Sequence, residues 1–213
     1  MKVRDLLIAG AGGHAVEILS VLQEINTEAE VYFFDDYNLK VDFLFGQYKI
    51  LHSTEEVATY FIQDSAFVLG TGSPKSRDIL YHKLTSLGGR VKSVIAASAI
   101  IGTYEVFLGE GINIMPFAAI TQRVSIGKGS LVHMHASVHH DSEVGIFCEL
   151  SPGCRILGGV KIGNYVSVGS NAVILPQVNI GNYAVIGAGA VVTKDVAEGQ
   201  TVVGVPAKEV KKK

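Results

Sequence analysis

The sequence is poor in several features, and each shortage narrows the class of protein. Hydrophobic residues make up 48% of the 213 positions, yet no run of about 18 apolar residues suggests a membrane span. Residues Met1 to Asp5 lack the apolar segment and cleavage site of a signal peptide, so we expect a cytoplasmic protein. The net charge is only −2, and it does not favour a nucleic-acid partner.

Aromatic and charged residues are scarce in one part of the chain. Of 17 aromatic residues only four lie within 108–192, and of 38 charged residues only eight do. A chain of 213 residues is long enough for two hydrophobic cores. The change in composition therefore predicts a boundary near residue 97, with one domain at 1–97 and a second at 98–213.

A strict period of six organises the second domain. The period is neither the 3.6 of an α-helix nor the 2 of an isolated strand. It predicts a solenoid in which each hexapeptide is a short strand and a corner, and in which stacked coils bury one another's side chains. The aliphatic positions are Leu108, Ile114, Ile120, Ile126, Val132, Val138, Val144, Leu150, Ile156, Ile162, Val168, Ile174, Ile180, Ile186 and Val192.

Two further columns support the solenoid. Four places after each aliphatic residue comes a mostly small side chain, which we expect in a crowded interior position. Cys148 and Cys154 fall in this column, so we expect two buried small side chains rather than a disulfide or a metal pair. Glycine directly follows many of the aliphatic residues, and we expect it to relax the backbone at a turn. These glycines are Gly109, Gly127, Gly145, Gly163, Gly169, Gly181 and Gly187.

The first 97 residues alternate predicted strands and helices, which favours a small parallel sheet of Rossmann type. The strands are expected at Val3–Ala9, Val31–Phe34, Ala66–Leu69 and Val91–Ile95. The helices are expected after a glycine turn at 10–14, from a capping box at Ser53 to about Phe61, and from Pro74 to Gly88.

The glycine turn, Gly10-Ala11-Gly12-Gly13-His14, follows the first strand and opens a helix, which is the context for holding phosphate on backbone N–H groups. It misses the full G-x-G-x-x-G spacing, because Ala15 takes the last place. An acidic residue, Asp35, ends the second strand about 20 residues later. The residues leave nucleotide binding and a plain tight turn both open, and the sheet is too small for a redox dinucleotide.

Four of the seven histidines lie in the segment 132–141: His133, His135, His139 and His140. All four avoid the two interior columns, so we expect none of them in the core. Exposed surface, zinc ligation and acid–base chemistry remain as roles. The pair His140-Asp141 offers a base with a carboxylate beside it, provided that the chain bends there.

Taken together, these motifs resemble the bacterial nucleotide-sugar acetyltransferases over essentially the whole chain. The likeness is carried by the glycine turn with His14, by Asp35-Asp36, and by a hexapeptide solenoid that ends in Gly-Val-Pro-Ala-Lys at 204–208. The family includes bacillosamine-pathway and perosamine N-acetyltransferases and sialic acid O-acetyltransferases. The resemblance implies a Rossmann-like domain followed by a left-handed parallel β-helix, with three hexapeptides in each coil.

The resemblance also implies site residues. The family's catalytic segment, roughly A-S-V-x-H followed by Asp or Glu, matches 136–141, which places the base on His140 and its orienting acid on Asp141. His133 stands where the family usually has asparagine, and Glu149 stands where many members have histidine. The implied contacts with the nucleotide sugar are Gly12, Gly13, His14, Asp35, Asp36 and His133. Those with acetyl-CoA are Glu149, Gly158 and Lys208, the last at the start of a basic tail.

The implied function is acetyl-CoA-dependent N-acetylation of a UDP- or GDP-linked amino-deoxy sugar, for bacterial surface glycan or glycoprotein synthesis, with no metal. The residues name neither the nucleobase nor the sugar carbon, and they leave N- and O-acetylation open. A sialic acid O-acetyltransferase, a zinc enzyme like the gamma-class carbonic anhydrases, and a non-catalytic scaffold are the alternatives. The resemblance further implies a homotrimer with active sites between subunits.

Overall fold

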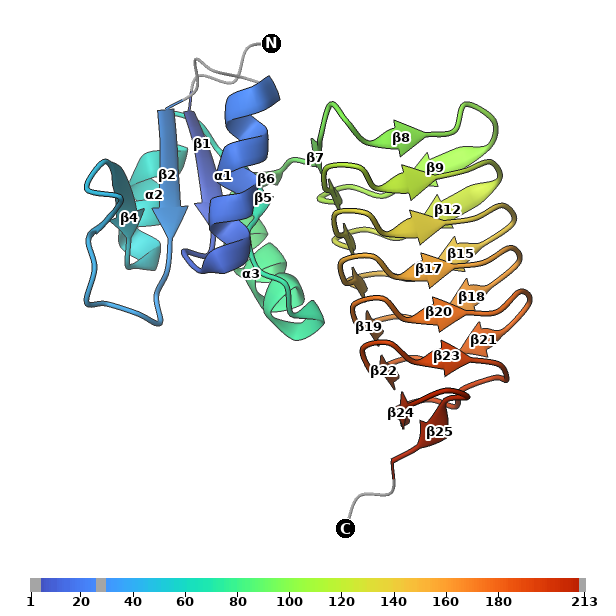
Figure 1. Ribbon diagram of the computed structural model, residues 1–213. Coiled ribbons are helices and arrows are strands. Elements are labelled where there is room, and N and C mark those ends of the chain that lie inside the picture. Colours follow the sequence, from blue (N-terminus) through green and yellow to red (C-terminus); the bar gives the residue numbers. More distant parts are fainter. Residues whose placement is uncertain (1–4, 26–29, 211–213) are drawn as a thin grey trace.

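The computed structural model describes residues 5–25 and 30–210, so the lysines at 211–213 and the N-terminal residues 1–4 lie outside the described residues. Figure 1 shows two units side by side, a twisted sheet with helices and a tall solenoid. Their order along the chain confirms the predicted fold class, an α/β Rossmann-like domain followed by a left-handed parallel β-helix.

The N-terminal unit is a sheet with the order β3-β4-β2-β1-β5-β6. Neighbouring strands pair in parallel, except that β3 and β4 form an antiparallel hairpin that the sequence pattern did not predict. The strands are β1 (Asp5–Ala9), β2 (Glu30–Phe34), β3 (Phe43–Leu44), β4 (Tyr48–Leu51), β5 (Ala66–Leu69) and β6 (Arg90–Val91).

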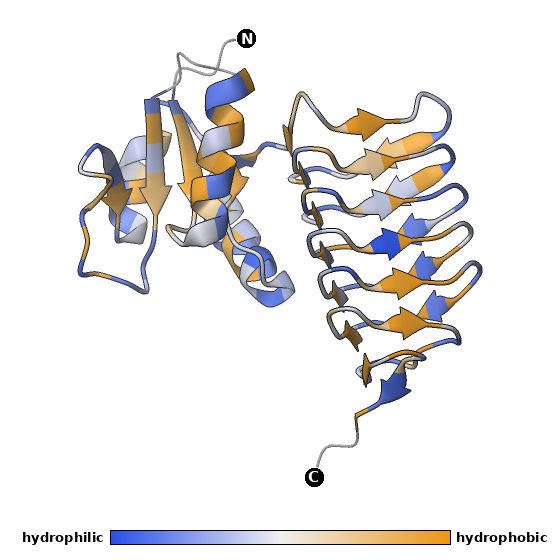
Figure 2. Ribbon diagram, viewed as in Figure 1, coloured by the Kyte–Doolittle hydropathy of each residue, from blue (hydrophilic) through white to orange (hydrophobic). Residues whose placement is uncertain are grey.

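The helices of this unit begin at the predicted signals: α1 (Gly13–Ile25), α2 (Thr54–Phe61) and α3 (Pro74–Ser86). The capping box of α2 is formed, because the Ser53 hydroxyl accepts from the Glu56 N–H and the Glu56 carboxylate accepts from the Ser53 N–H. The central strands β1 and β2 are mostly apolar, as Figure 2 shows. No helix in the described ranges is long and apolar enough to cross a bilayer.

The solenoid has three walls, each a stack of short strands that pair in parallel, except that the last strand of the first wall is antiparallel to its neighbour. Asn113 pairs with Leu131 and Leu131 pairs with Glu149, so each coil takes 18 residues, or three hexapeptides. One wall contains β7 (Val94–Ile95), β10 (Asn113–Ile114), β13 (Leu131–Val132), β16 (Glu149–Leu150), β19 (Ser167–Val168), β22 (Val185–Ile186), β24 (Thr201–Val203) and β25 (Lys208–Glu209). The second contains β8 (Ile100–Ile101), β11 (Ala119–Ile120), β14 (Ser137–Val138), β17 (Arg155–Ile156), β20 (Val173–Ile174) and β23 (Val191–Val192). The third contains β9 (Val106–Leu108), β12 (Val124–Ile126), β15 (Glu143–Val144), β18 (Lys161–Ile162) and β21 (Asn179–Ile180).

The two predicted interior columns form the solenoid core. From Ile114 to Val192 every residue of the large aliphatic column is at most 4% exposed, and Ser130 and Ser142 of the small column are fully buried. Cys148 and Cys154 are free and buried, as expected, and burial raises the pKa of each thiol to about 12. The hydroxyl of Ser130 donates to the Gly145 carbonyl, so this polar residue is satisfied inside the core.

The predicted role of the glycines after the aliphatic positions was wrong. None of them has a positive φ; instead, a Cβ on Gly127 or Gly145 would lie 2.5–2.6 Å from backbone atoms of the next coil. These glycines allow the coils to approach closely. The left-handed backbone recurs instead at one corner residue in every six, and side chains as large as Phe147, Tyr165 and Tyr183 occupy it.

Arg77 of α3 joins the two units. Its guanidinium is fully buried and donates to carbonyls on both sides of the junction, to Thr71 at 2.8 Å in the N-terminal unit and to Gly129 at 2.5 Å in the solenoid. Burial lowers the pKa of Arg77 to about 9, so the group is still charged at neutral pH. These bonds to backbone oxygens hold the α/β unit against the wall that contains β10 and β13.

The expected strand at 91–95 was wrong, because two different strands share it. β6 completes the N-terminal sheet, whereas β7 pairs with β10 and begins the first wall of the solenoid. The backbone changes sheets between them, and Val94 is buried in the apolar cluster that includes α1. The boundary near residue 97 stays a prediction from composition.

Candidate functional site

His140 and Asp141 lie at a corner of the solenoid, directly after β14. Asp141 has a φ of +63°, and this left-handed backbone supplies the bend that lets adjacent side chains meet. The His140 Nδ1 lies 2.7 Å from the Asp141 Oδ2. Because an ionised carboxylate can only accept, Nδ1 carries the proton and Nε2 keeps a free lone pair. The pair thus leaves one basic nitrogen on a ring that is largely exposed to solvent.

Arg123 completes this corner from the coil before. Its Nε and Nη2 donate to the two carboxylate oxygens of Asp141 at 2.5 and 3.0 Å. The hydrogen bonds from Arg123, and then from His140, lower the pKa of the Asp141 carboxyl well below its usual range. Asp141 is therefore ionised at any pH at which the protein would work.

Gly158 provides the space for the imidazole. A Cβ at this position would lie 2.6 Å from the His140 Cε1 and 2.8 Å from Nε2. Gly158 does not have a positive φ, so glycine is needed here because a side chain would collide with the imidazole, and not because of an unusual backbone conformation. The neighbouring Gly159 N–H donates to the His140 carbonyl at 2.8 Å and keeps the two corners in register.

A second group of predicted residues gathers at the carboxyl ends of β1, β2 and β5. Gly12, Asp35 and Asp36 line a cavity of about 360 Å³ there. The Asp35 Oδ1 accepts from the backbone N–H groups of residues 37 and 38, and Asp36 forms an ion pair with Lys83 of α3. In open α/β sheets this edge is where ligands bind. Gly13 and His14 lie beside the cavity but do not line it.

His14 and His133 meet across the junction of the two units. Their ring centroids are 5.0 Å apart, with the planes nearly perpendicular. Burial, and secondarily Arg77, lowers the pKa of His14 to about 3; burial and then His14 lower the pKa of His133 to about 4. The expectation that none of the four histidines is buried was wrong for His133, which is 8% exposed. The interior columns could not show this, because the α/β unit covers that wall from outside.

The two remaining predicted residues lie apart from His140. Glu149 is on β16, and a Cβ on Gly72 would come within 3.5 Å of its carboxylate, so it faces the N-terminal unit of its own chain. Burial raises the pKa of Glu149, and the nearby Arg77 opposes that shift. Lys208 is exposed on β25, which pairs with β24 at the end of the solenoid.

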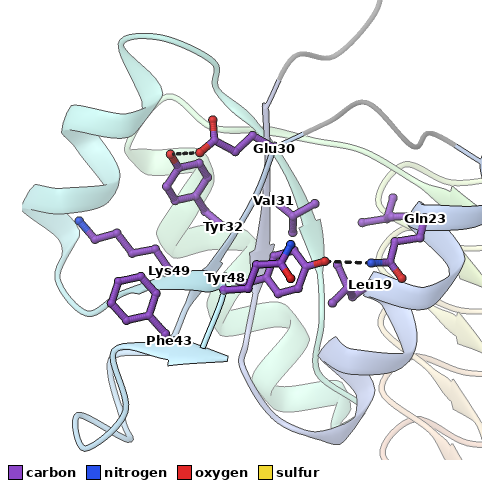
Figure 3. Close-up of a pocket in the computed structure, with 10 residues that line it drawn as sticks. Leu19, Gln23, Glu30, Val31, Tyr32, Phe43, Tyr48 and Lys49 are labelled. Atoms are coloured by element: carbon purple, nitrogen blue, oxygen red, sulfur yellow. Dashed lines mark hydrogen bonds between the residues drawn. The ribbon is translucent and has the colours of Figure 1, made fainter. Parts of the chain in front are cut away.

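A larger cavity of about 500 Å³ lies between α1 and the edge of the sheet (Figure 3). Tyr48 and Gln23 are hydrogen-bonded across it at 2.9 Å, and Glu30 at the start of β2 also lines it. The cavity is therefore at the amino ends of the strands, away from the glycine turn. It contains none of the predicted site residues.

Within one chain, the His140 corner and the cavity at the glycine turn lie on different sides of the solenoid. The N-terminal unit covers the wall of β10, β13 and β16, through Arg77 and the His14–His133 contact. His140 instead follows β14, in the second wall, and lies at its junction with the third wall. The cavity at the glycine turn therefore lies on the side of the wall that does not carry the His140–Asp141 pair, which we call the dyad.

Sequence reasoning missed Arg123, although a signal for it exists. Arg123 precedes Asp141 by 18 residues, so the coil of three hexapeptides that the resemblance implies stacks the two side chains. Arg77 had no such signal for its bond to the Gly129 carbonyl, which crosses to the solenoid. Glu17 lies one helical turn after His14, but its approach to His133 depends on the packing of the two units.

Comparisons with known proteins agree with this geometry. The family model "PglD N-terminal domain" matches residues 5–84, and "Bacterial transferase hexapeptide (six repeats)" matches residues 159–194. A mutant of perosamine N-acetyltransferase from Caulobacter crescentus, solved with CoA and GDP-perosamine, is 27% identical, with a TM-score of 0.87 over 98% of this chain and 97% of that one.

Two further solved structures are similar over their whole length. The acetyltransferase domain of PglB from Neisseria gonorrhoeae FA1090, solved with acetyl coenzyme A, is 25% identical with a TM-score of 0.89, covering 98% of this chain and 100% of that one. WeeI from Acinetobacter baumannii AYE is 28% identical with a TM-score of 0.87, covering 96% and 99%.

A PglD-type α/β unit joined to a hexapeptide solenoid defines an acyltransferase, so the chain is an enzyme of that class. More particularly, it is similar over its whole length to the bacterial nucleotide-sugar acetyltransferases. These matches do not favour the sialic acid O-acetyltransferase or the zinc enzyme considered as alternatives.

Proposed function

We propose that this protein transfers the acetyl group of acetyl-CoA to the amine of a UDP- or GDP-linked amino-deoxy sugar used in bacterial surface glycans or glycoproteins. The observation that carries the proposal is the solvent-facing His140–Asp141 pair, set at a corner of a solenoid whose relatives include a complex with acetyl coenzyme A and one with CoA and GDP-perosamine. Transfer of an acyl group to an amine needs a base that removes one proton, and this corner offers one.

His140 acts as that general base. The amine nitrogen attacks the thioester carbonyl carbon while Nε2 of His140 takes its proton. Asp141 holds the ring tautomer and stabilises the imidazolium that forms, and Arg123 keeps the carboxylate in place. As the C–S bond breaks, the proton passes from His140 to the departing CoA sulfur. The amide product and free CoA account for every atom.

Gly158 lies where the thioester must approach. Its missing side chain leaves the face of the imidazole open, and its backbone N–H is our candidate donor to the oxyanion that develops on the carbonyl. No metal takes part in these steps. Glu149 and Lys208 remain proposed acetyl-CoA contacts, and in one chain neither lies beside His140.

The nucleotide binds in the cavity at the glycine turn. Gly12 and Gly13 open α1, so their N–H groups and the helix dipole favour a diphosphate there. Asp35 and Asp36 line the base and ribose side of the cavity, and His14 and His133 stand between the cavity and the solenoid.

We propose a homotrimer in which the nucleotide held by one chain meets His140 of the next. The support is the separation within one chain of the glycine-turn cavity and the dyad, which lie on different sides of the solenoid. Acetyl-CoA would lie along the outer wall between solenoids. We place the reaction in the cytoplasm, where acetyl-CoA and nucleotide sugars are available.

The His140→Asn variant tests the reaction. Removing a general base lowers kcat by about 10²–10⁴, while the exposed ring contributes little to folding. The measurement is acetyl transfer from acetyl-CoA to a UDP-amino sugar, a GDP-amino sugar and free sialic acid, together with a thermal melt. His139→Asn, one residue earlier, is the matched control and should keep its activity. A wild-type kcat in His140→Asn would exclude this residue as the base.

A further inference from the structure

A cluster of two histidines and one glutamate lies where α1 meets the solenoid, and the proton transfer by His140 does not use it. His14 and Glu17 come from the first turns of α1, and His133 comes from the corner after β13. The His14 Nδ1 lies 3.2 Å from the Glu17 Oε2, and the His133 Nδ1 lies 3.8 Å from the same oxygen. One ligand atom from each of the three residues falls within 4.8 Å of the others.

These separations suit one small cation. Tetrahedral zinc holds imidazole nitrogen and carboxylate oxygen at about 2.0–2.1 Å, which places neighbouring ligand atoms roughly 3.3–3.5 Å apart. The two measured contacts with Glu17 bracket that range, so small side-chain rotations would close the cluster around an ion. We propose that His14, Glu17 and His133 bind a divalent transition-metal ion of the zinc class.

The surroundings of His133 independently indicate a missing ligand. This residue is 8% exposed, and its Nδ1 has no hydrogen-bond partner among the described residues although the atom is fully buried. The atom lies on the side of the ring that faces Glu17. A buried polar atom without a partner destabilises the folded protein, and a bound ion would satisfy it.

The charge in the cluster selects a cation over an anion. A phosphate oxygen at this point would be repelled by the carboxylate of Glu17, whereas a metal ion is attracted to it. The neutral imidazole, with one nitrogen lone pair free, is the form of histidine that coordinates a metal. Two neutral imidazoles with one carboxylate are a familiar ligand set for zinc.

The ion would link the two units rather than take part in acetyl transfer. Two ligands come from α1 and one from the solenoid, and three protein ligands leave a fourth coordination position open for water or a ligand oxygen. The site differs from the zinc enzyme considered from the sequence, because His135 stacks on Phe117 at another corner residue and does not join the cluster.

Isothermal titration of the untagged, metal-stripped full chain with ZnCl₂ tests this proposal without any substrate. The wild-type chain should bind one equivalent of zinc and unfold at a higher temperature when zinc is present. Glu17→Gln and His133→Asn should each weaken binding at least ~tenfold and remove the thermal shift. His135→Asn is the matched control and should bind like the wild type.

Each outcome decides the question. Glu17 is exposed and asparagine is the residue that the family resemblance expects at position 133, so both variants should fold. Loss of binding in both, with retention in His135→Asn, supports the site. The absence of saturable binding to the wild type, wild-type affinity in either ligand variant, or loss of affinity in the control would overturn it.

Discussion

Asp141 serves two purposes at once, as the corner residue of a coil and as the partner of His140. A left-handed backbone at a non-glycine residue costs energy, and in this solenoid the cost recurs at one position in every six. At most corners the side chain only packs on its neighbours in adjacent coils, as Tyr165 packs on Tyr183 at 5.0 Å. At residue 141 the same geometry turns a carboxylate back onto the preceding imidazole.

Arg123 is a positioning residue for this pair, and its removal should impair turnover more than binding. In Arg123→Gln the Asp141 carboxylate loses two hydrogen bonds and swings more freely, so we expect kcat to fall about tenfold with the KM for acetyl-CoA nearly unchanged. Arg123→Lys should recover part of the loss. Steady-state kinetics of both variants, with the exposed Arg155→Gln as control, would measure this. A raised KM with wild-type kcat would show instead that the guanidinium binds acetyl-CoA.

At the scale of elements, α1 and the corner after β13 depend on each other. Neither element alone would bury a histidine, but together they bury His14 and His133 face to edge. Only the folded state bears the free-energy cost of desolvating a charged imidazole. Burial therefore lowers the pKa values of His14 and His133. The junction is therefore sensitive to acid.

Stability should fall as the pH drops from about 6.5 towards 4. The unfolded histidines bind protons near pH 6.5, whereas the folded ones resist protonation down to pKa values of about 3 and about 4. The stabilisation that comes from neutral, buried imidazoles is fully present above pH 6.5. Between pH 7.5 and 5 the free energy of unfolding should fall by up to about 2 kcal/mol for each of the two histidines. Urea unfolding of the chain in EDTA at the two pH values would measure it.

The matched variants for this measurement are His14→Gln with His133→Asn, and His82→Gln as the exposed control on α3. The double variant should show a shallower dependence on pH than the wild type, and His82→Gln should follow the wild type. An unchanged dependence in the double variant would mean that these imidazoles are already charged in the folded protein.

At the scale of the whole molecule, the solenoid has three faces and separates the α/β unit from the His140 corner. One face carries the α/β unit through the buried Arg77, and the His140 corner lies away from that face. A closed ring of three copies would let the nucleotide cavity of each chain face the dyad of a neighbour. The arrangement would explain why the cavity at the glycine turn and His140 are separated within one chain.

Mixing two inactive variants tests the proposed ring. His140→Asn lacks the base, and Asp35→Asn with Asp36→Asn lacks the acidic residues of the nucleotide cavity. If each site combines two chains, an equal mixture refolded together should regain about a quarter of wild-type activity, because a quarter of the sites pair an intact base with an intact cavity. Each variant refolded alone is the control. A mixture no more active than its parents would place the whole site within one chain.

Much of the solenoid followed from local repetition. A period of six with a large and a small interior column buries those side chains in stacked coils, so the short strands and the two buried cysteines could be predicted. The coil of 18 residues was implied by the family resemblance and not by the period, and that coil length stacks Arg123 on Asp141. The α/β signals were also local, because caps, glycines and short apolar runs act on neighbouring residues.

The sequence by itself therefore determined the contacts that the six-residue repeat or a helix cap specifies. Tertiary structure alone decided the contacts between the units, namely the burial of Arg77 and the approach of His133 to His14 and Glu17, and it also divided the segment 90–95 between β6 and β7. The contacts of Arg77 with Gly129 and of Glu17 with His133 join residues about 50 to 120 positions apart that no repeat relates. The physical reason is that a repeated sequence makes each coil pack on the next coil in the same way. The docking of two different units depends instead on the shape and charge of both surfaces.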